Sequence, residues 1–433
     1  MDFNSTSMES VLTRLTSVLE GMGDGYLEHP AIPYNINQLL ETAIDNRASM
    51  LHINVGSPPM LRINEQLVPI GEHQLTRGDC RKLLYPLLTR EQREAIYSGL
   101  EIDGCFPSSG TGFRLNVYKE RGNLSASIRR LRSDIPSLDS LGMSSSAIEQ
   151  ILMEPSGLVI LTGAPRSGKL NTLAAMVSHL NSTRNARIIS LEKPIQFWHQ
   201  KAMSTVVQRE IGIDTKSFAH GIQQAVVQDP DIIALTDVPD KETAEFVIRA
   251  AAGGHLVLAA IDASSCVRVL ERLYKTFPPS DIYSKIISTL ADSLKAVICQ
   301  TSIFRGENSP ALPVFEIMTN SEAVHRALQE GATERLPEIM RKENMQTLGR
   351  TLSSLVTAGT ISREIALAHV SSPEDLNISS SSGLSASSGQ EPRINASIAA
   401  SPLSSPKDEE PEEEVTPIPT IPDATDNPLV AWL

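Results

Sequence analysis

A glycine-rich segment with a lysine, residues 163–172, holds the residue types that could bind phosphate. Gly163, Gly168 and Lys169 match the pattern G-x-x-x-x-G-K-[ST], in which backbone N–H groups and the lysine hold phosphate oxygens. The eighth position is Leu170, where a serine or threonine normally gives its hydroxyl to Mg²⁺. The predicted nucleotide-binding residues are Gly163, Ala164, Pro165, Arg166, Ser167, Gly168, Lys169, Leu170, Asn171 and Thr172.

The residues on either side supply the strand and the helix that such a loop requires. GLVILT, before the loop, is a short apolar run typical of a buried parallel strand, and LNTLAAMVSHL, after it, has helical spacing. A glycine-rich turn before a helix is the ordinary alternative, but the order of strand, loop and helix favours a phosphate loop. ATP is therefore the candidate cofactor, and Leu170 argues against a bound Mg²⁺.

The composition indicates a cytoplasmic protein with two ordered domains and an acidic tail. The chain has 433 residues, and residues 371–433 hold 11 acidic and 2 basic ones, so the tail carries 9 of the 13 net negative charges. The rest is close to neutral, which gives no support to nucleic-acid binding. The four cysteines lie far apart and predict neither a zinc ribbon nor a disulfide framework.

Membrane insertion and secretion are not predicted. No apolar run reaches the roughly 18 residues that a membrane span needs. The first residues, MDFNSTSMES, lack the basic region and apolar core of a signal peptide. We therefore expect no transmembrane segment and a cytoplasmic location. Peripheral attachment to the inner membrane is the alternative.

Changes in pattern divide the chain into five zones. A leader, 1–35, precedes a mixed helix-and-strand domain, 36–134, in which INQLLETAIDNRA is helical and MLHINV and FRLNVY alternate like half-buried strands. A connector, 135–150, leads to an α/β domain, 151–370. The Ser-rich and Pro-rich tail, 371–433, is predicted to be disordered because it cannot bury enough apolar surface.

The zone 151–370 predicts a parallel sheet with crossover helices, because apolar strands alternate there with helical patterns. The strand candidates are GLVILT, ARIISL, DIIAL and HLVLAAI.

Longer strings in residues 36–370 resemble the PilT-type retraction ATPases of type IV pili, within the wider family of secretion ATPases. The strings that carry the resemblance are INVGSPPMLRINEQL, FRLNVYKERGNLSASIRRL, MEPSGLVILTG, QREIGIDTKSF, QDPDIIAL, GGHLVLAAIDASS and SLKAVICQT. The resemblance implies a PAS-like α+β N-terminal domain and a RecA-like P-loop domain. It also implies a hexameric ring, formed by this chain alone or mixed with an active paralogue, and an inner-membrane pilus platform protein as partner.

The sequence departs from the family pattern where the chemistry lies. The family's Glu-Asp-Pro-Ile-Glu box is here residues 192–196, which read EKPIQ, and its Gly-Glu after the Walker B strand is Thr236 and Asp237. Asp237 and Glu192 are the remaining catalytic candidates, because a carboxylate can accept a proton. Asp237 is one methylene shorter than the family's glutamate, and capping of the next helix is its ordinary alternative.

Three further residues are assigned by the resemblance. Arg114 and Arg129 lie where the family has sensor or finger arginines, which stabilise phosphoryl charge, and an ordinary surface role is the alternative. His255 stays in the family's histidine box, and a core histidine with satisfied hydrogen bonds is the alternative. The later Leu-His-Thr of that box is Ile261, Asp262 and Ala263 here.

These departures predict a retraction-ATPase paralogue with weak or absent hydrolysis that acts as a structural or regulatory ring subunit. One alternative is an active retraction motor for twitching motility that uses Asp237, Glu192 and Thr172 in an altered geometry. Another is a nucleotide-independent adaptor that recruits partners through its tail.

Overall fold

The computed structural model describes residues 32–370, except 144–145, 278–280, 306–308 and 310, together with residues 374 and 376. The predicted leader and tail therefore lie almost entirely outside the described residues.

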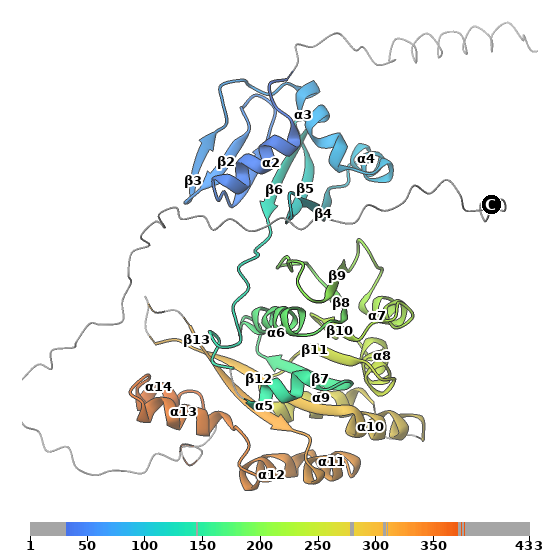
Figure 1. Ribbon diagram of the computed structural model, residues 1–433, viewed down its shortest axis with the longest axis vertical. Helices are drawn as coiled ribbons and strands as arrows, with labels where there is room; N and C mark the ends of the chain where they lie inside the picture. The colour runs from blue at the N-terminus through green and yellow to red at the C-terminus, as the bar shows by residue number, and fades with distance from the viewer. Residues whose placement is uncertain are drawn as a thin grey trace, which may run out of the picture. The chain divides into compact units, whose positions relative to one another are not determined.

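The N-terminal domain is a six-stranded antiparallel sheet covered by helices (Figure 1). The strand order is β3-β2-β1-β6-β5-β4. The predicted helix and both predicted strands of this zone are present, as α2, β1 and part of β5. The elements are α2 (Ile36–Asp45), β1 (Met50–Ile53), β2 (Met60–Ile63), β3 (Gln66–Pro69), α3 (Arg77–Leu84), η1 (Tyr85–Leu87), α4 (Arg90–Tyr97), β4 (Ile102–Ser108), β5 (Thr111–Glu120) and β6 (Asn123–Arg130).

The second domain is a seven-stranded sheet in the order β13-β12-β7-β11-β10-β8-β9. Its neighbouring strands are parallel except β13, which runs antiparallel to β12. All four strand candidates are confirmed, as β7, β8, β10 and β11. The strands are β7 (Gly157–Gly163), β8 (Arg187–Glu192), β9 (Thr205–Glu210), β10 (Ile232–Leu235), β11 (Leu256–Asp262), β12 (Leu294–Ile303) and β13 (Leu312–Thr319).

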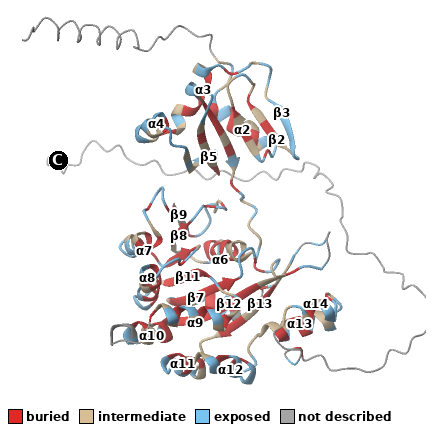
Figure 2. Ribbon diagram, turned by 180° about the vertical axis from the view of Figure 1, so that it is seen from behind, coloured by how far each residue is buried: buried red, intermediate tan, exposed pale blue. Residues whose placement is uncertain are grey.

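Helices cover both faces of this sheet because alternate residues of its strands point to opposite sides. Leu158 and Ile160 of β7 pack with α7, α8, α9 and α10, whereas Val159 and Leu161 pack with α5 and α6. Figure 2 shows the central strands buried between these layers. The helices are α5 (Ser146–Met153), α6 (Lys169–Thr183), α7 (Phe218–Val226), α8 (Lys241–Ala252), α9 (Cys266–Thr276), α10 (Asp281–Ser293), α11 (Glu322–Gln329), η2 (Thr333–Arg335), α12 (Leu336–Lys342), α13 (Leu348–Thr357) and α14 (Arg363–Leu367).

Helix α5 begins at Ser146, inside the segment 135–150 that the sequence predicts to be a connector. Its Ile148, Ile151 and Leu152 have the i, i+3, i+4 spacing of an apolar helix face and pack against the sheet. The serines just before them gave the segment a loop-like composition, and packing on the sheet overrides it.

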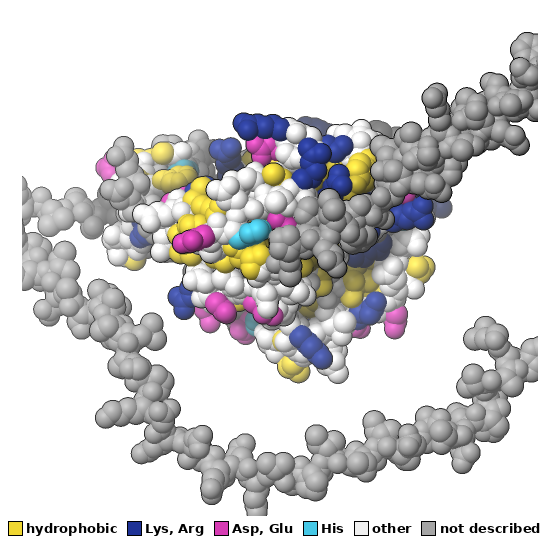
Figure 3. Space-filling view, turned by 90° about the horizontal axis from the view of Figure 1, so that it is seen from above, with side chains coloured by type: hydrophobic (Ala, Val, Ile, Leu, Met, Phe, Trp, Pro, Cys, Tyr) yellow, Lys and Arg dark blue, Asp and Glu magenta, His cyan; other side chains and the backbone are white. Residues whose placement is uncertain are grey.

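One face of the described residues is mixed in character. On the face shown in Figure 3, basic, acidic and hydrophobic side chains are interspersed. Within the described ranges, no helix combines the length and the apolar character needed to cross a membrane.

Candidate nucleotide-binding site

The backbone of residues 163–169 forms a tight loop between the end of β7 and the start of α6. Gly168 has φ +87°, a left-handed conformation that suits glycine, and α6 begins at the next residue. A Cβ atom added to Gly163 would lie 2.5 Å from the Gln300 carbonyl oxygen of β12. Only glycine fits at Gly163, so the neighbouring strand requires the first glycine of the loop.

The loop has polar groups that suit a phosphate. The Ser167 hydroxyl is buried and has no hydrogen-bond partner among the described residues. The first N–H groups of α6 have no partners within their helix, and a helix N-terminus carries partial positive charge. Residues 163–169 therefore fit the phosphates of a nucleotide, with Lys169 as the cationic group.

Lys169 already has an anionic partner in this chain. Its Nζ atom forms an ion pair with Oδ1 of Asp262, the last residue of β11. The lysine side chain is 12% exposed and that of Asp262 is 48% exposed. Asp262 was not among the predicted site residues.

An apolar residue occupies the motif position that normally supplies a metal ligand. Leu170 is half-buried and packs against the cluster on the α5–α6 side of the sheet. The next hydroxyl along α6, that of Thr172, is fully buried and donates to Oε1 of Gln300 at 2.7 Å. Neither residue presents an oxygen to a metal beside the loop, so this part of the site does not fit a Mg²⁺ ion held in the usual way.

Glu192, the last residue of β8, is engaged inside the protein. One carboxylate oxygen accepts hydrogen bonds from the Ser190 hydroxyl and the Gln208 amide, both at 2.8 Å. Burial raises the pKa of Glu192 above its usual range, while these two hydrogen bonds act in the opposite direction. The carboxyl of Glu192, predicted to be a catalytic proton acceptor, therefore already takes part in hydrogen bonds inside the protein.

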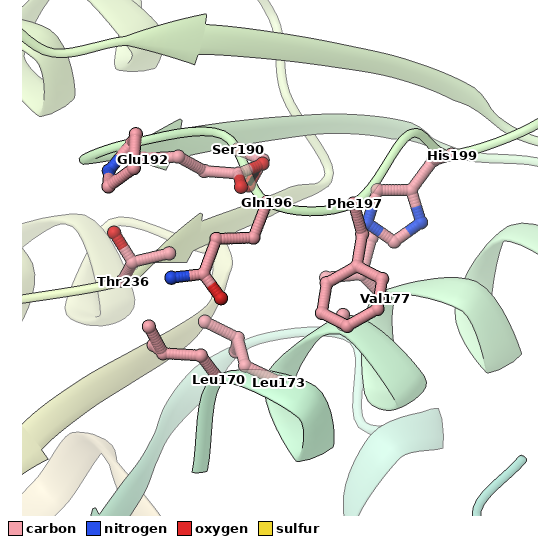
Figure 4. A pocket seen from close by; sticks show the side chains of 11 residues that line it. Leu170, Leu173, Val177, Ser190, Glu192, Gln196, Phe197, His199 and Thr236 are labelled. Atoms are coloured by element: carbon pink, nitrogen blue, oxygen red, sulfur yellow. Dashed lines mark hydrogen bonds between the residues drawn. The ribbon is translucent and has the colours of Figure 1, made fainter. Parts of the chain in front are cut away.

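A small pocket separates Glu192 from α6 (Figure 4). Leu170 and Leu173 line it from the helix, and the Gln196 side chain extends toward them from the opposite side. His199 also lines it, and burial lowers the pKa of that imidazole to about 4. At neutral pH the His199 imidazole in this pocket is therefore neutral, and Gln196 presents a neutral amide.

Asp237 follows β10 and is exposed, unlike Glu192. Burial of part of the group raises its pKa, and the nearby Asp262 carboxylate adds to this effect, whereas the Val238 N–H and Lys169 lower it. The alternative that Asp237 caps the next helix is wrong, because Asp240 is the N-cap of α8 and accepts from the Thr243 N–H at 2.8 Å. Asp237 is thus a carboxylate at the same end of the sheet as the loop.

The two predicted sensor arginines have different surroundings. Arg114 donates to Glu210 at 3.1 Å and to Asp103 at 2.6 Å, so its guanidinium is paired within this chain. Arg129 is its direct neighbour across β5 and β6 and is exposed. Arg129 is therefore the better placed of the two to meet an outside anion.

His255 lies at the other end of the sheet from the phosphate loop. It precedes β11, whose first residue pairs with Gly157, at the start of β7. Its ring Nδ1 lies 2.8 Å from the Pro230 carbonyl oxygen. This position favours the alternative of a satisfied structural histidine in the single chain.

Sequence reasoning missed two residues of the site, Asp262 and Gln300. A signal for Asp262 was present, because a polar residue at the carboxyl end of a parallel strand lies at the edge where the phosphate loop also lies. For Gln300 no such signal existed, since it lies within β12, whose sequence LKAVICQTSI contains several polar residues, so that one glutamine does not stand out.

The parallel sheet, the loop after β7 and the lysine at the start of α6 define a P-loop protein with a RecA-like nucleotide-binding domain. Residues 27–367 match the family model described as Type II/IV secretion system protein, and the chain belongs to this family.

Two relatives from Pseudomonas aeruginosa are similar over most of their length. The chain is 32% identical over 345 residues to "Type IV pilus retractation ATPase PilT", covering 79% of this chain and 99% of the relative. It is 30% identical to "Type IV pilus ATPase PilU", covering 79% and 90%. Among solved structures, "Crystal Structure of the Pilus Retraction Motor PilT and Bound ADP" matches with a TM-score of 0.65 and 28% identity, over 79% of this chain and 99% of that one.

Proposed function

We propose that this protein is a PilT-like ring subunit of a type IV pilus or secretion system whose ATP hydrolysis is weak or lost, and that its role is structural or regulatory. The observation that supports this most directly is that the polar groups of the site are paired with one another or with other residues of the same chain. Asp262 pairs with Lys169, and Glu192 is held by Ser190 and Gln208.

Hydrolysis needs a metal or other cation on the phosphates and a positioned acceptor for the water proton. Leu170 supplies no metal ligand, and Gln196 replaces a family carboxylate with a neutral amide. Thr172 donates to Gln300 and so has its hydroxyl committed elsewhere. Divergence at these positions, beside a loop that keeps its glycines and lysine, supports retained phosphate binding without efficient turnover.

The pilus context comes from the relatives, and the ring comes from the family resemblance. The names of two of them specify a type IV pilus ATPase, and a solved relative is a pilus retraction motor with bound ADP. We propose ATP or ADP as ligand, a homohexamer or a mixed ring with an active paralogue, and an inner-membrane pilus platform protein as partner. Arg129 would face the nucleotide of an adjacent subunit in such a ring.

The deciding experiment is phosphate release from ATP and Mg²⁺ by the purified full-length protein. We expect a rate at the buffer background, and no rescue by Leu170→Ser, because one restored hydroxyl leaves the carboxylates as they are. Each missing acid–base or electrostatic group typically costs about 10²-fold or more, although such losses are not additive. Robust hydrolysis that Lys169→Ala abolishes would overturn the proposal.

An active retraction motor is the second candidate, and Asp237 is the observation that favours it. This carboxylate is exposed, lies close enough to Lys169 and Asp262 to feel their charges, and has a raised pKa. In that case Asp237→Asn would lower the rate by about 10²-fold or more, the usual contribution of a general base. If the subunit is inactive, as proposed, Asp237→Asn leaves the rate at the buffer background.

Assembly is tested separately from turnover. Light scattering of the protein, alone and mixed with an active paralogue, should show an oligomer in at least one sample. Monomers in both samples would exclude both kinds of ring.

A further inference from the structure

The sheet itself places a carboxylate against the phosphate-binding lysine. Asp262 of β11 is the register partner of Gly163 of β7, the first glycine of the loop. Its Oδ1 pairs with Nζ of Lys169. Because strand hydrogen bonds fix this register, the carboxylate is presented at the loop by the sheet.

Neighbouring contacts anchor the end of β11. Arg272 of α9 donates from Nη1 to the Asp262 carbonyl oxygen at 2.8 Å. Thr162 of β7 donates from Oγ1 to the Ala263 carbonyl oxygen at 3.3 Å. The backbone of Asp262 is therefore held in place while its side chain remains half-exposed.

The geometry points to Asp262 as a built-in competitor for phosphate at Lys169, which weakens nucleotide binding in proportion to the negative charge of the ligand. Carboxylate and phosphate oxygens both accept charge-assisted hydrogen bonds from an ammonium group, so they compete for Lys169. A ligand must break the pair and then lie beside a displaced carboxylate, whose like charge repels it. The inference deepens the proposed function by naming a residue that regulates its nucleotide site.

The test is calorimetric titration of full-length protein with adenosine, ADP and ATP, in chelator so that metal does not contribute. Asp262→Asn keeps the size of the side chain and removes its charge. We expect ATP affinity to rise on the order of ten-fold, ADP affinity to rise less, and adenosine affinity to stay unchanged. Asp139→Asn, at an exposed turn, is the matched control and should change none of them.

A double substitution separates competition from a general structural effect. In the Lys169→Ala background, Asp262→Asn should raise ATP affinity less than it does in the natural protein, since the competed cation is gone. An equal gain for adenosine and ATP, or the same gain with and without Lys169, would overturn the inference. So would unchanged or absent ATP binding by a folded Asp262→Asn protein.

These outcomes are distinct from failure of the proposed function. Robust hydrolysis by the natural protein would overturn the inactive-subunit proposal, and the affinity ratios measured in chelator would still decide the role of Asp262.

Discussion

The phosphate loop and the neighbouring strand ends lie at one edge of the same sheet, but they differ in whether their polar groups are available to a ligand. The loop keeps Gly163, Gly168 and Lys169 and the backbone that would surround a phosphate. At the strand ends, Glu192 is turned to internal partners and Asp262 pairs with the lysine. The frame that holds phosphate and the groups that would act on it are therefore separable.

The difference has a packing cause. Gly163 meets the carbonyl oxygen of Gln300 so closely that a side chain there would displace β12. The exposed side chains of Asp237 and Asp262 meet no such restriction. Packing thus limits the residue type at Gly163 to glycine, whereas it sets no such limit on the exposed carboxylates at the strand ends.

The largest expected effect is on the loop side of the comparison. Gly163→Ala should lower the free energy of unfolding by about 2–3 kcal/mol, because the added methyl overpacks the loop against β12. Urea denaturation measures this. Gly104→Ala is the control, since its Cβ would lie 3.5 Å from Ile213, an ordinary contact, and it should change the stability by no more than about 0.5 kcal/mol. Equal stability of the two variants would contradict the packing argument.

Lys169→Ala should lower ATP affinity by about ten-fold to a hundred-fold, the usual worth of a hydrogen bond to a charged group. In the natural protein the affinity should be weak and nearly the same with Mg²⁺ and with chelator, because Leu170 gives the metal no ligand. Titration in both buffers measures this, with Lys216→Ala, an exposed lysine, as control. Tight binding that disappears in chelator would show that the metal site is intact.

Leu170→Ser changes the last position of the loop motif, in the first turn of α6. The leucine is half-buried, so its loss should reduce the free energy of unfolding by about 1 kcal/mol. Thermal or urea denaturation measures the change. A gain in stability would mean that Leu170 does not contribute to the apolar cluster beside α6.

The smallest expected effect is a change in how stability depends on pH. A carboxyl whose pKa is raised on folding contributes stability that is fully present below its usual pKa and is lost as the pH rises through the folded value. Glu192→Gln keeps an oxygen acceptor for Ser190 and Gln208 and removes this loss. The free energy of unfolding should therefore fall less between pH 4 and pH 7 than in the natural protein, whereas Glu149→Gln, on the exposed face of α5, should leave the difference unchanged. Identical pH profiles of the natural protein and Glu192→Gln would contradict the prediction.

Local patterns determined much of the fold in advance. The runs GLVILT, ARIISL, DIIAL and HLVLAAI are each strands of the parallel sheet, since a strand buried on both faces must be apolar throughout. The loop glycines and the helix after them could also be located, because a short stretch of sequence specifies both. The run of serines at 144–146 led to the prediction of a connector because its composition indicates a loop, although the apolar spacing of the residues after it indicates a helix.

The predicted α/β fold class followed from the sequence, but the state of each site residue did not. Thr172 meets Gln300 across 128 residues of sequence, and Lys169 meets Asp262 through the register of β7 and β11. Those contacts decide whether a hydroxyl, a carboxylate or an ammonium is available to a ligand. The sequence determined where a phosphate loop forms, because loop geometry is local. Only the tertiary structure decided which charges compete for it, because strand order brings distant residues to the same edge of the sheet.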